Sequence, residues 1–115
     1  MKRLFTFLVL SAFSSSIFAQ SECDGTRYVD YDAFSSVDVT SGVTFGNNNA
    51  LGGGPVDLLM DVYEPAGDSE TNRPVVVIAF GGSFIGGQRS DVEFLCRIFA
   101  KLGYVAVAPD YRVGF

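Results

Sequence analysis

The sequence predicts an α/β fold class, in which an antiparallel opening hairpin is followed by a β-α-β unit of a mostly parallel sheet. Two patterns lead to this prediction. First, the loosely alternating stretch 28–45 and the alternating stretch 56–63 flank a turn rich in Asn and Gly, which is typical of a hairpin. Second, the short apolar runs 75–80 and 104–108 lie on either side of a segment with helical spacing. That order favours two parallel strands joined by a right-handed crossover helix.

The opening hairpin follows from its turn and from its alternation. Residues 46–55 combine Asn and Gly, which tolerate positive φ, and they form the clearest turn in the chain. In the returning strand every second residue is apolar: Val56, Leu58, Met60 and Val62. Asp57 and Asp61 have the spacing of one strand face, and we expect both of them to face solvent.

The β-α-β unit begins with the run 75–80, whose unbroken apolar character is expected of a strand buried on both faces. A glycine-rich loop, 81–87, comes next. Ser90 and Glu93 have the spacing of a capping box, so we expect the helix to begin at Ser90. Gly103 is the expected stop. The apolar residues of the helix are expected in the core: Phe94, Leu95, Ile98, Phe99 and Leu102.

Residues 1–19 have the pattern of a signal peptide. A charged start is followed by the apolar run 4–13, and Ala19 is a small residue suited to cleavage before the next position. The apolar run is far shorter than the roughly 20 residues of a membrane-spanning helix, so we expect no membrane span. The sequence therefore predicts a secreted or periplasmic protein. Its mature part is residues 20–115, of which 20–27 are expected to be an exposed tail.

The charge of the mature chain argues against one class of partner. Removal of Lys2 and Arg3 with the signal peptide leaves 6 basic and 13 acidic residues, a net charge of −7. Nucleic-acid phosphates require a basic surface, so we expect no nucleic-acid partner. Net charge says little about a small substrate, because it governs solubility more than chemistry.

The two cysteines, Cys23 and Cys96, are expected to form a disulfide, because an even count in an exported protein favours pairing. The bridge would close a loop of about 70 residues, worth roughly 4–5 kcal/mol in the chain-entropy model. Two unpaired thiols, one of them buried, are the alternative. With no His in the sequence and only two cysteines, we expect no metal site.

The glycine-rich loop 81–87 occupies a strand-to-helix position that several kinds of site use. A dinucleotide-binding loop needs G-x-G-x-x-G, and Ser83 stands where the second Gly is required. A phosphate-binding loop needs Lys and then Ser or Thr after its last Gly, and Gln88 and Arg89 stand there instead. Two interpretations remain: an oxyanion hole, and a plain turn that only needs glycine.

Three segments, in this order, carry a family resemblance. Residues 61–65, Asp-Val-Tyr-Glu-Pro, are followed by residues 80–84, Phe-Gly-Gly-Ser-Phe, and then by residues 103–112, Gly-Tyr-Val-Ala-Val-Ala-Pro-Asp-Tyr-Arg. They resemble the D-V-Y-x-P strand, the His-Gly-Gly-Gly-Phe oxyanion loop and the G-Y-V-V-x-x-x-D-Y-R strand of the carboxylesterase and lipase families. The resemblance covers about residues 56–115. It implies the N-terminal part of an α/β-hydrolase fold, incomplete at its C-terminal side.

The resemblance also implies how the loop works. The backbone N–H groups of Gly82 and Ser83 are the implied donors to the ester carbonyl oxygen, which becomes negative in the transition state. Gly81 is implied to leave room for the substrate. Phe80 replaces the His of the family, so we expect it to brace the loop by packing. Ser83 replaces a Gly but keeps its backbone donor.

The catalytic residues themselves are missing. A serine hydrolase needs a nucleophile, a base and an orienting acid, and the chain has neither a His nor a G-x-S-x-G motif. We therefore expect a fragment of a secreted serine carboxylic-ester hydrolase, inactive alone and without a cofactor. Its sheet would end at the fourth strand, 104–108, with an exposed edge and an uncovered apolar face.

The substrate implied by the resemblance is a small-molecule or polysaccharide-linked ester. Asp110 and Arg112 are expected to anchor the loop after the fourth strand rather than to touch that substrate, and Tyr111 is expected to pack near the site. A non-catalytic hydrolase-like protein used for binding or adhesion is an alternative, and so is a peptidase of the same fold. The sequence leaves the acyl and alcohol specificity and the oligomeric state open.

Overall fold

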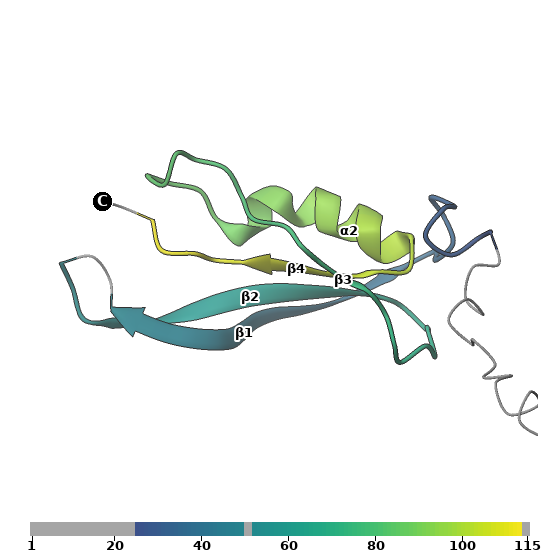
Figure 1. Ribbon diagram of the computed structural model, residues 1–115, viewed down its shortest axis with the longest axis horizontal. Helices are drawn as coiled ribbons and strands as arrows, with labels where there is room; N and C mark the ends of the chain where they lie inside the picture. Colours follow the sequence, from purple (N-terminus) through teal and green to yellow (C-terminus); the bar gives the residue numbers. More distant parts are fainter. Residues whose placement is uncertain (1–24, 50–51, 114–115) are drawn as a thin grey trace, which may run out of the picture.

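The computed structural model describes residues 25–49 and 52–113 (Figure 1). Along the chain, two long strands come first, followed by a short strand, a 3-10 turn, a helix and a last strand. Their bounds are β1, Val37–Asn49; β2, Pro55–Pro65; β3, Val75–Val77; η1, Arg89–Val92; α2, Glu93–Lys101; and β4, Val105–Pro109. The predicted order of elements is confirmed.

The four strands form one mixed sheet in the order β1-β2-β4-β3. Strand β2 pairs antiparallel with both β1 and β4, whereas β3 and β4 are parallel. The predicted α/β class with a mostly parallel sheet is therefore wrong. Strands make up 37% and helices 15% of the described residues, so the domain is mostly sheet. The physical reason is that the long hairpin supplies most of the sheet, and β4 joins the free edge of β2 in the opposite direction.

The antiparallel opening hairpin is confirmed, and β1 contains a bulge. The register with β2 shifts between Thr40 and Val43. Gly42, within this shift, has a φ of 71°, a left-handed conformation that glycine adopts without a side-chain clash. Its N–H group donates to Oδ1 of Asp61 in β2 at 2.8 Å. The bulge thus turns a backbone donor from the strand ladder toward a carboxylate.

Strand β3 is shorter and more exposed than predicted. A strand over 75–80 buried on both faces was expected, but only Val75–Val77 pair with β4, and Val75 and Val77 are 61% and 65% exposed. The prediction is wrong because β3 lies at the edge of the sheet. The exposed edge was expected at the strand 104–108. It lies at β3 instead, because β4 is inserted between β2 and β3.

The helix begins later than predicted. Turn η1 comes first, and α2 starts at Glu93. The Ser90 capping box does not form. Instead, the carboxylate of Asp91 accepts a hydrogen bond from the N–H of Gln88 at 3.0 Å. Glu93 pairs with Arg97 one turn further along the helix, at 2.8 Å.

The predicted end of the helix is confirmed. Gly103 has a φ of 104°. Its N–H donates to the carbonyl of Ala100 at 2.9 Å, and the N–H of Tyr104 donates to the carbonyl of Phe99 at 3.1 Å. This pair of bonds is the Schellman motif, in which glycine is favoured at the left-handed position. A Cβ at Gly103 would also lie 2.9 Å from Cγ of Arg27, so no side chain fits there.

Helix α2 packs on one face of the sheet over a core of mostly small side chains. The core residues, all at most 1% exposed, are Tyr63, Cys96, Ala100, Ala106 and Ala108. Phe99 packs against them, as predicted. The prediction that Phe94 and Leu95 are core residues is wrong, since they are 74% and 46% exposed. The helix turns its Cys96–Ala100 side to the sheet, so these two residues point elsewhere.

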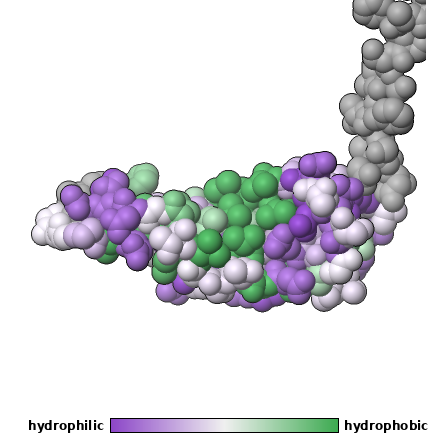
Figure 2. Space-filling view, turned by 90° about the horizontal axis from the view of Figure 1, so that it is seen from below, coloured by the Kyte–Doolittle hydropathy of each residue, from purple (hydrophilic) through white to green (hydrophobic). Residues whose placement is uncertain are grey.

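The opposite face of the sheet is apolar and open. By the register of the strands, Val62 and Val77 lie on either side of Val107, and Val75 lies beside Val105 on the same face. Figure 2, seen from below the sheet, shows an apolar area at its centre. Among residues 25–49 and 52–113, no helix packs on this face, so in the described part of the chain the expected uncovered apolar face is present.

The N-terminal segment is fastened to the domain where the structure describes it. Tyr28 donates its N–H to the carbonyl of Leu102 at 2.7 Å. Arg27 pairs with Asp68 in the loop after β2, and both side chains are nearly buried. The exposed tail predicted for 20–27 is therefore wrong at its last residue, Arg27, whereas Gly25 and Thr26 are exposed as predicted. The signal peptide expected at 1–19 lies outside the described residues. In 25–49 and 52–113, no helix has both the length and the apolar character that a membrane crossing needs.

Candidate functional site

The glycine-rich loop leaves the sheet just after β3 and turns back before η1. Ile78 is the last residue tied to β4, through its N–H to the carbonyl of Val107 at 2.9 Å. Three consecutive residues then have positive φ: Gly82 at 149°, Ser83 at 54° and Phe84 at 62°. The turn closes when the N–H of Ile85 donates to the carbonyl of Gly82 at 3.0 Å.

Positive φ at both Ser83 and Phe84 places the turn in the type I′ class, where Asn and Gly are the usual residues. A bulky residue with positive φ is an outlier. Such strained residues cost about 1–3 kcal/mol each, and they cluster at functional sites. The backbone strain therefore identifies this turn as a candidate functional site.

The four glycines of the loop divide into two that the fold requires and two that it does not. A Cβ at Gly82 would overlap the carbonyl oxygen of Gly86 and lie 2.9 Å from its carbonyl carbon. A Cβ at Gly87 would lie 2.7 Å from the carbonyl oxygen of Gly81 and would overlap the ring of Phe80. Gly81 and Gly86 have open space around that position. The fold itself would therefore accept a side chain at Gly81 and at Gly86.

The turn presents unused backbone donors. Within the described residues, the N–H groups of Gly82, Ser83 and Phe84 donate to no acceptor. All three residues are exposed. Successive N–H groups on a turn of this kind form a concave site for an anion or a developing negative charge. Gly82 and Ser83, the predicted donors, are thus brought together on one turn.

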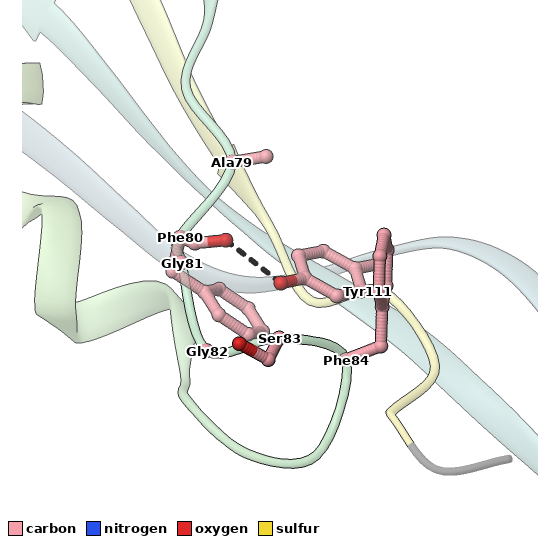
Figure 3. A pocket seen from close by; sticks show the side chains of 7 residues that line it. All are labelled: Ala79, Phe80, Gly81, Gly82, Ser83, Phe84 and Tyr111. Atoms are coloured by element: carbon pink, nitrogen blue, oxygen red, sulfur yellow. Dashed lines mark hydrogen bonds between the residues drawn. The ribbon is translucent and has the colours of Figure 1, made fainter.

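The turn forms one wall of a pocket of about 390 Å³. Figure 3 shows the side chains that line it: Ala79, Phe80, Gly81, Gly82, Ser83, Phe84 and Tyr111. Tyr111 follows β4, and every other lining residue belongs to the segment after β3. The parallel pairing of β3 and β4 brings these two segments to the same end of the sheet.

Tyr111 holds the base of the loop. Its hydroxyl donates to the carbonyl of Phe80 at 2.7 Å (Figure 3). Its ring stacks on that of Phe80, with ring centroids 4.3 Å apart and planes inclined by 16°. Phe80 itself is 4% exposed. Packing of Phe80 therefore braces the loop. The hydrogen bond from Tyr111 is a second anchor, which the sequence analysis did not predict.

Arg89 anchors the other end of the loop by joining two acidic residues. Its Nε donates to Oδ1 of Asp61 at 2.9 Å, and its terminal nitrogen pairs with Oδ2 of Asp110. Its backbone N–H donates to the other oxygen of Asp110 at 2.9 Å. Hydrogen bonds to Asp110 and to Asp61 raise the pKa of the guanidinium. The expectation that Asp110 anchors rather than binds substrate agrees with these contacts.

Other predicted residues have different surroundings. Asp61 is 7% exposed, so its predicted solvent exposure is wrong: the Gly42 bulge and Arg89 compensate its burial. Asp57 is exposed as predicted and accepts a hydrogen bond from Asn47. Arg112 donates to the carbonyl of Asn49 in β1 at 3.0 Å.

The predicted disulfide stays a prediction. Cys96 is a fully buried thiol in the core, and its expected partner, Cys23, lies outside the described residues. Burial, with repulsion from Asp61, raises the pKa of the Cys96 thiol to about 11. A thiolate at this position is therefore disfavoured at neutral pH.

The catalytic apparatus of a hydrolase is not assembled by these residues. The Ser83 hydroxyl makes no hydrogen bond in the described part of the chain, and the sequence has no His to act as its base. Among residues 25–49 and 52–113, no three His, Cys, Asp or Glu side chains come together as a metal site would require. What the site offers is a set of donors beside a pocket.

Comparisons with protein-family models, with curated proteins and with solved structures returned no match. Any assignment of function therefore depends on the geometry of the loop and on the three sequence segments that resemble the carboxylesterase and lipase families. The loop itself is the part of the molecule where both kinds of observation coincide.

Sequence reasoning missed Arg89, Phe84 and the hydrogen bond of Tyr111. A signal for Arg89 was present: it follows the glycine loop, and acidic residues stand in β2 and directly after β4. No pattern in the sequence pointed to the left-handed conformation of Phe84, because phenylalanine rarely adopts it. The sequence also did not distinguish Gly82 and Gly87, which the fold requires, from the other two glycines of the loop.

Proposed function

We propose that the turn at Gly82–Phe84 is the oxyanion-binding element of a secreted serine carboxylic-ester hydrolase. One observation supports this above the others: three successive residues with positive φ lie beside a pocket, and their N–H groups have no acceptor among the described residues. The similarity of residues 80–84 to the oxyanion loop of carboxylesterases and lipases points to the same chemistry.

The chemistry required of such a loop is electrostatic. When a nucleophile attacks an ester, the carbonyl oxygen becomes negative, and fixed N–H donors stabilise that charge. Loss of a single donor of this kind costs about 3–4 kcal/mol of transition-state stabilisation in a serine protease. The strain at Ser83 and Phe84 and the tight packing at Gly82 fix the donors before substrate binds, so little reorganisation is needed in the reaction.

Hydrolysis also needs a nucleophile and a base. An unassisted serine hydroxyl is a poor nucleophile, and these 115 residues contain no histidine. In this proposal the nucleophile, the base and the orienting acid act from polypeptide outside the sequence. The chain alone is expected to hydrolyse p-nitrophenyl acetate no faster than buffer does.

The donors can be tested in the chain alone with acetate, whose carboxylate oxygen stands in for the oxyanion of the transition state. In a ¹⁵N-labelled sample, titration with acetate should shift the amide signals of Gly82 and Ser83. Gly82→Ala should abolish these shifts, because its Cβ would overlap the Gly86 carbonyl and displace the turn. Gly86→Ala is the matched control, since its Cβ meets open space and the shifts should persist.

The enzyme itself is tested in the product of the native gene. Gly82→Ala should lower kcat for a short-chain nitrophenyl ester by on the order of a hundredfold, whereas Gly86→Ala should leave kcat nearly unchanged. Equal effects of the two substitutions on kcat would contradict a specific role for the turn.

A second function, ester or carboxylate binding without turnover, is favoured by the lack of any histidine. The same N–H groups could hold a carboxylate anion at equilibrium. The two functions differ in one measurement. If the product of the native gene binds acetate at the turn but does not hydrolyse the ester, the binding function holds and the enzyme is excluded.

A further inference from the structure

The pocket beside the turn is lined with aromatic rings. The Tyr111 ring stands between the other two, stacked on Phe80 and at 65° to Phe84, with 6.2 Å between the Tyr111 and Phe84 centroids (Figure 3). Because the Tyr111 hydroxyl donates a hydrogen bond to the Phe80 carbonyl, the Tyr111 ring is held in place. Among the described residues, the lining contains no charged side chain. The part of a ligand that lies against these rings is therefore expected to be uncharged and mainly apolar, whereas a negative oxygen would lie at the N–H donors of the turn.

Phe84 is the unusual member of this set. Its side chain is 63% exposed although it is large and apolar, and its φ of 62° is one that phenylalanine seldom adopts. Neither burial nor backbone preference explains this placement. The N–H group of Phe84 is one of the three that have no acceptor in the described part of the chain, so the ring and the donors belong to the same turn. An apolar group bound next to the donors would cover the exposed ring.

We propose that Phe84 and Tyr111 form the acyl-group site of this protein and select esters of aromatic carboxylic acids. This inference rests on the proposed function, because the donors of the turn must hold the carbonyl oxygen of the same ester. The acyl ring would lie against Phe84 and Tyr111 while the carbonyl oxygen faces Gly82 and Ser83. A pocket of about 390 Å³ is at the small end of the range for ligand sites, which suits a single ring.

The aromatic preference follows from the rings. Aromatic pairs gain an edge-to-face or offset-stacking attraction beyond the area that they bury, and an aliphatic ring of the same size gains only the burial. The planes of the Phe84 and Tyr111 rings are inclined by 65°, so a ring bound against both would meet them at different angles. Comparing the affinities of an aromatic ring and a saturated ring of similar size therefore isolates the aromatic contribution.

The test uses three carboxylates on the ¹⁵N-labelled chain: benzoate, cyclohexanecarboxylate and acetate. Each carboxylate stands in for the acyl group and carbonyl oxygen of an ester. Benzoate should bind about two- to tenfold more tightly than cyclohexanecarboxylate, with shifts at the amides of Gly82, Ser83 and Phe84. Phe84→Leu, which keeps an apolar side chain of similar size, should remove most of that preference. Acetate, which has no ring, reports binding to the N–H donors alone.

Phe94→Leu is the matched control. It makes the same substitution at another exposed phenylalanine, on α2 and outside this pocket, so the preference for benzoate should persist. Equal affinities for benzoate and cyclohexanecarboxylate overturn the aromatic site, and so does a preference that survives in Phe84→Leu. In either case, acetate shifts at Gly82 and Ser83 would leave the proposed oxyanion function standing. If none of the three carboxylates shifts those amides, the function and the acyl site fail together.

Discussion

Arg89 connects three separate parts of the chain through one side chain and one backbone group. Its guanidinium reaches Asp61 in β2 and Asp110 after β4, and it stands at the end of the glycine loop. Asp61 is nearly buried, so its charge depends on these partners for compensation. Breaking a buried ion pair by removing one partner leaves an uncompensated charge, which costs more than the pair contributes.

We predict that Arg89→Gln destabilises the protein by about 1–3 kcal/mol, since a neutral side chain cannot compensate Asp61 and Asp110. Arg97→Gln is the control. Its partner is Glu93 at 2.8 Å, but both side chains are more than 40% exposed, and such surface pairs contribute at most about 1 kcal/mol. Urea denaturation at pH 7 measures both. Equal losses of unfolding free energy would show that Arg89 is an ordinary surface arginine.

At the scale of elements, the contact between α2 and the sheet depends on small residues. Ala106 and Ala108 of β4 meet Cys96 and Ala100 of the helix, and all four are fully buried. The helix can therefore approach the strand closely. The opposite face of the same strand bears Val105 and Val107 and has no such cover.

We predict that Ala108→Leu costs about 1–3 kcal/mol, because three additional carbons cannot enter a filled helix–sheet contact without displacing α2. Val77→Leu is the control on the other face of the sheet, where a 65% exposed side chain can enlarge freely and the cost should stay within about 0.5 kcal/mol. Thermal unfolding followed by circular dichroism distinguishes the two. A stable Ala108→Leu variant would mean that α2 does not pack against this residue.

Sequence patterns predicted the strands and the helix better than they predicted how the strands pair in the sheet. The hairpin and the helix stop at Gly103 are local, since turn chemistry and alternation decide them. The pairing of β4 with β2 joins segments that are distant in sequence. No local pattern shows whether β4 pairs with β2 or extends a parallel sheet. The same holds for the candidate site. Gly82 and Ser83 were predicted from the resemblance of residues 80–84 to a family loop, which is a local pattern, whereas Arg89 was missed because its partners are distant in sequence.

At the scale of the whole molecule, Arg27 ties the N-terminal segment to the loop between β2 and β3. Its guanidinium binds Asp68, which also accepts the N–H of Glu70 at 3.1 Å. Burial alone would raise the pKa of the Asp68 carboxyl. The hydrogen bonds from Arg27 and from the Glu70 backbone, together with the nearby charges, outweigh burial and lower that pKa below its usual value.

The lowered pKa makes a prediction about stability in acid. The unfolded chain binds a proton at Asp68 at a higher pH than the folded chain does, so the stabilisation is present above the unfolded pKa, about 4, and is lost as pH falls through the folded value. We predict that Asp68→Asn is less stable than the parent at pH 7 but loses less unfolding free energy between pH 5 and pH 2.5. The control is Asp32→Asn, since Asp32 is 81% exposed and its pair with Lys101 spans 3.4 Å. It should follow the parent at every pH, because exposed pairs contribute little. Urea denaturation across this pH range gives the unfolding free energy of all three proteins. If Asp68→Asn lost as much unfolding free energy in acid as the parent does, this ion pair would not fasten the N-terminal segment.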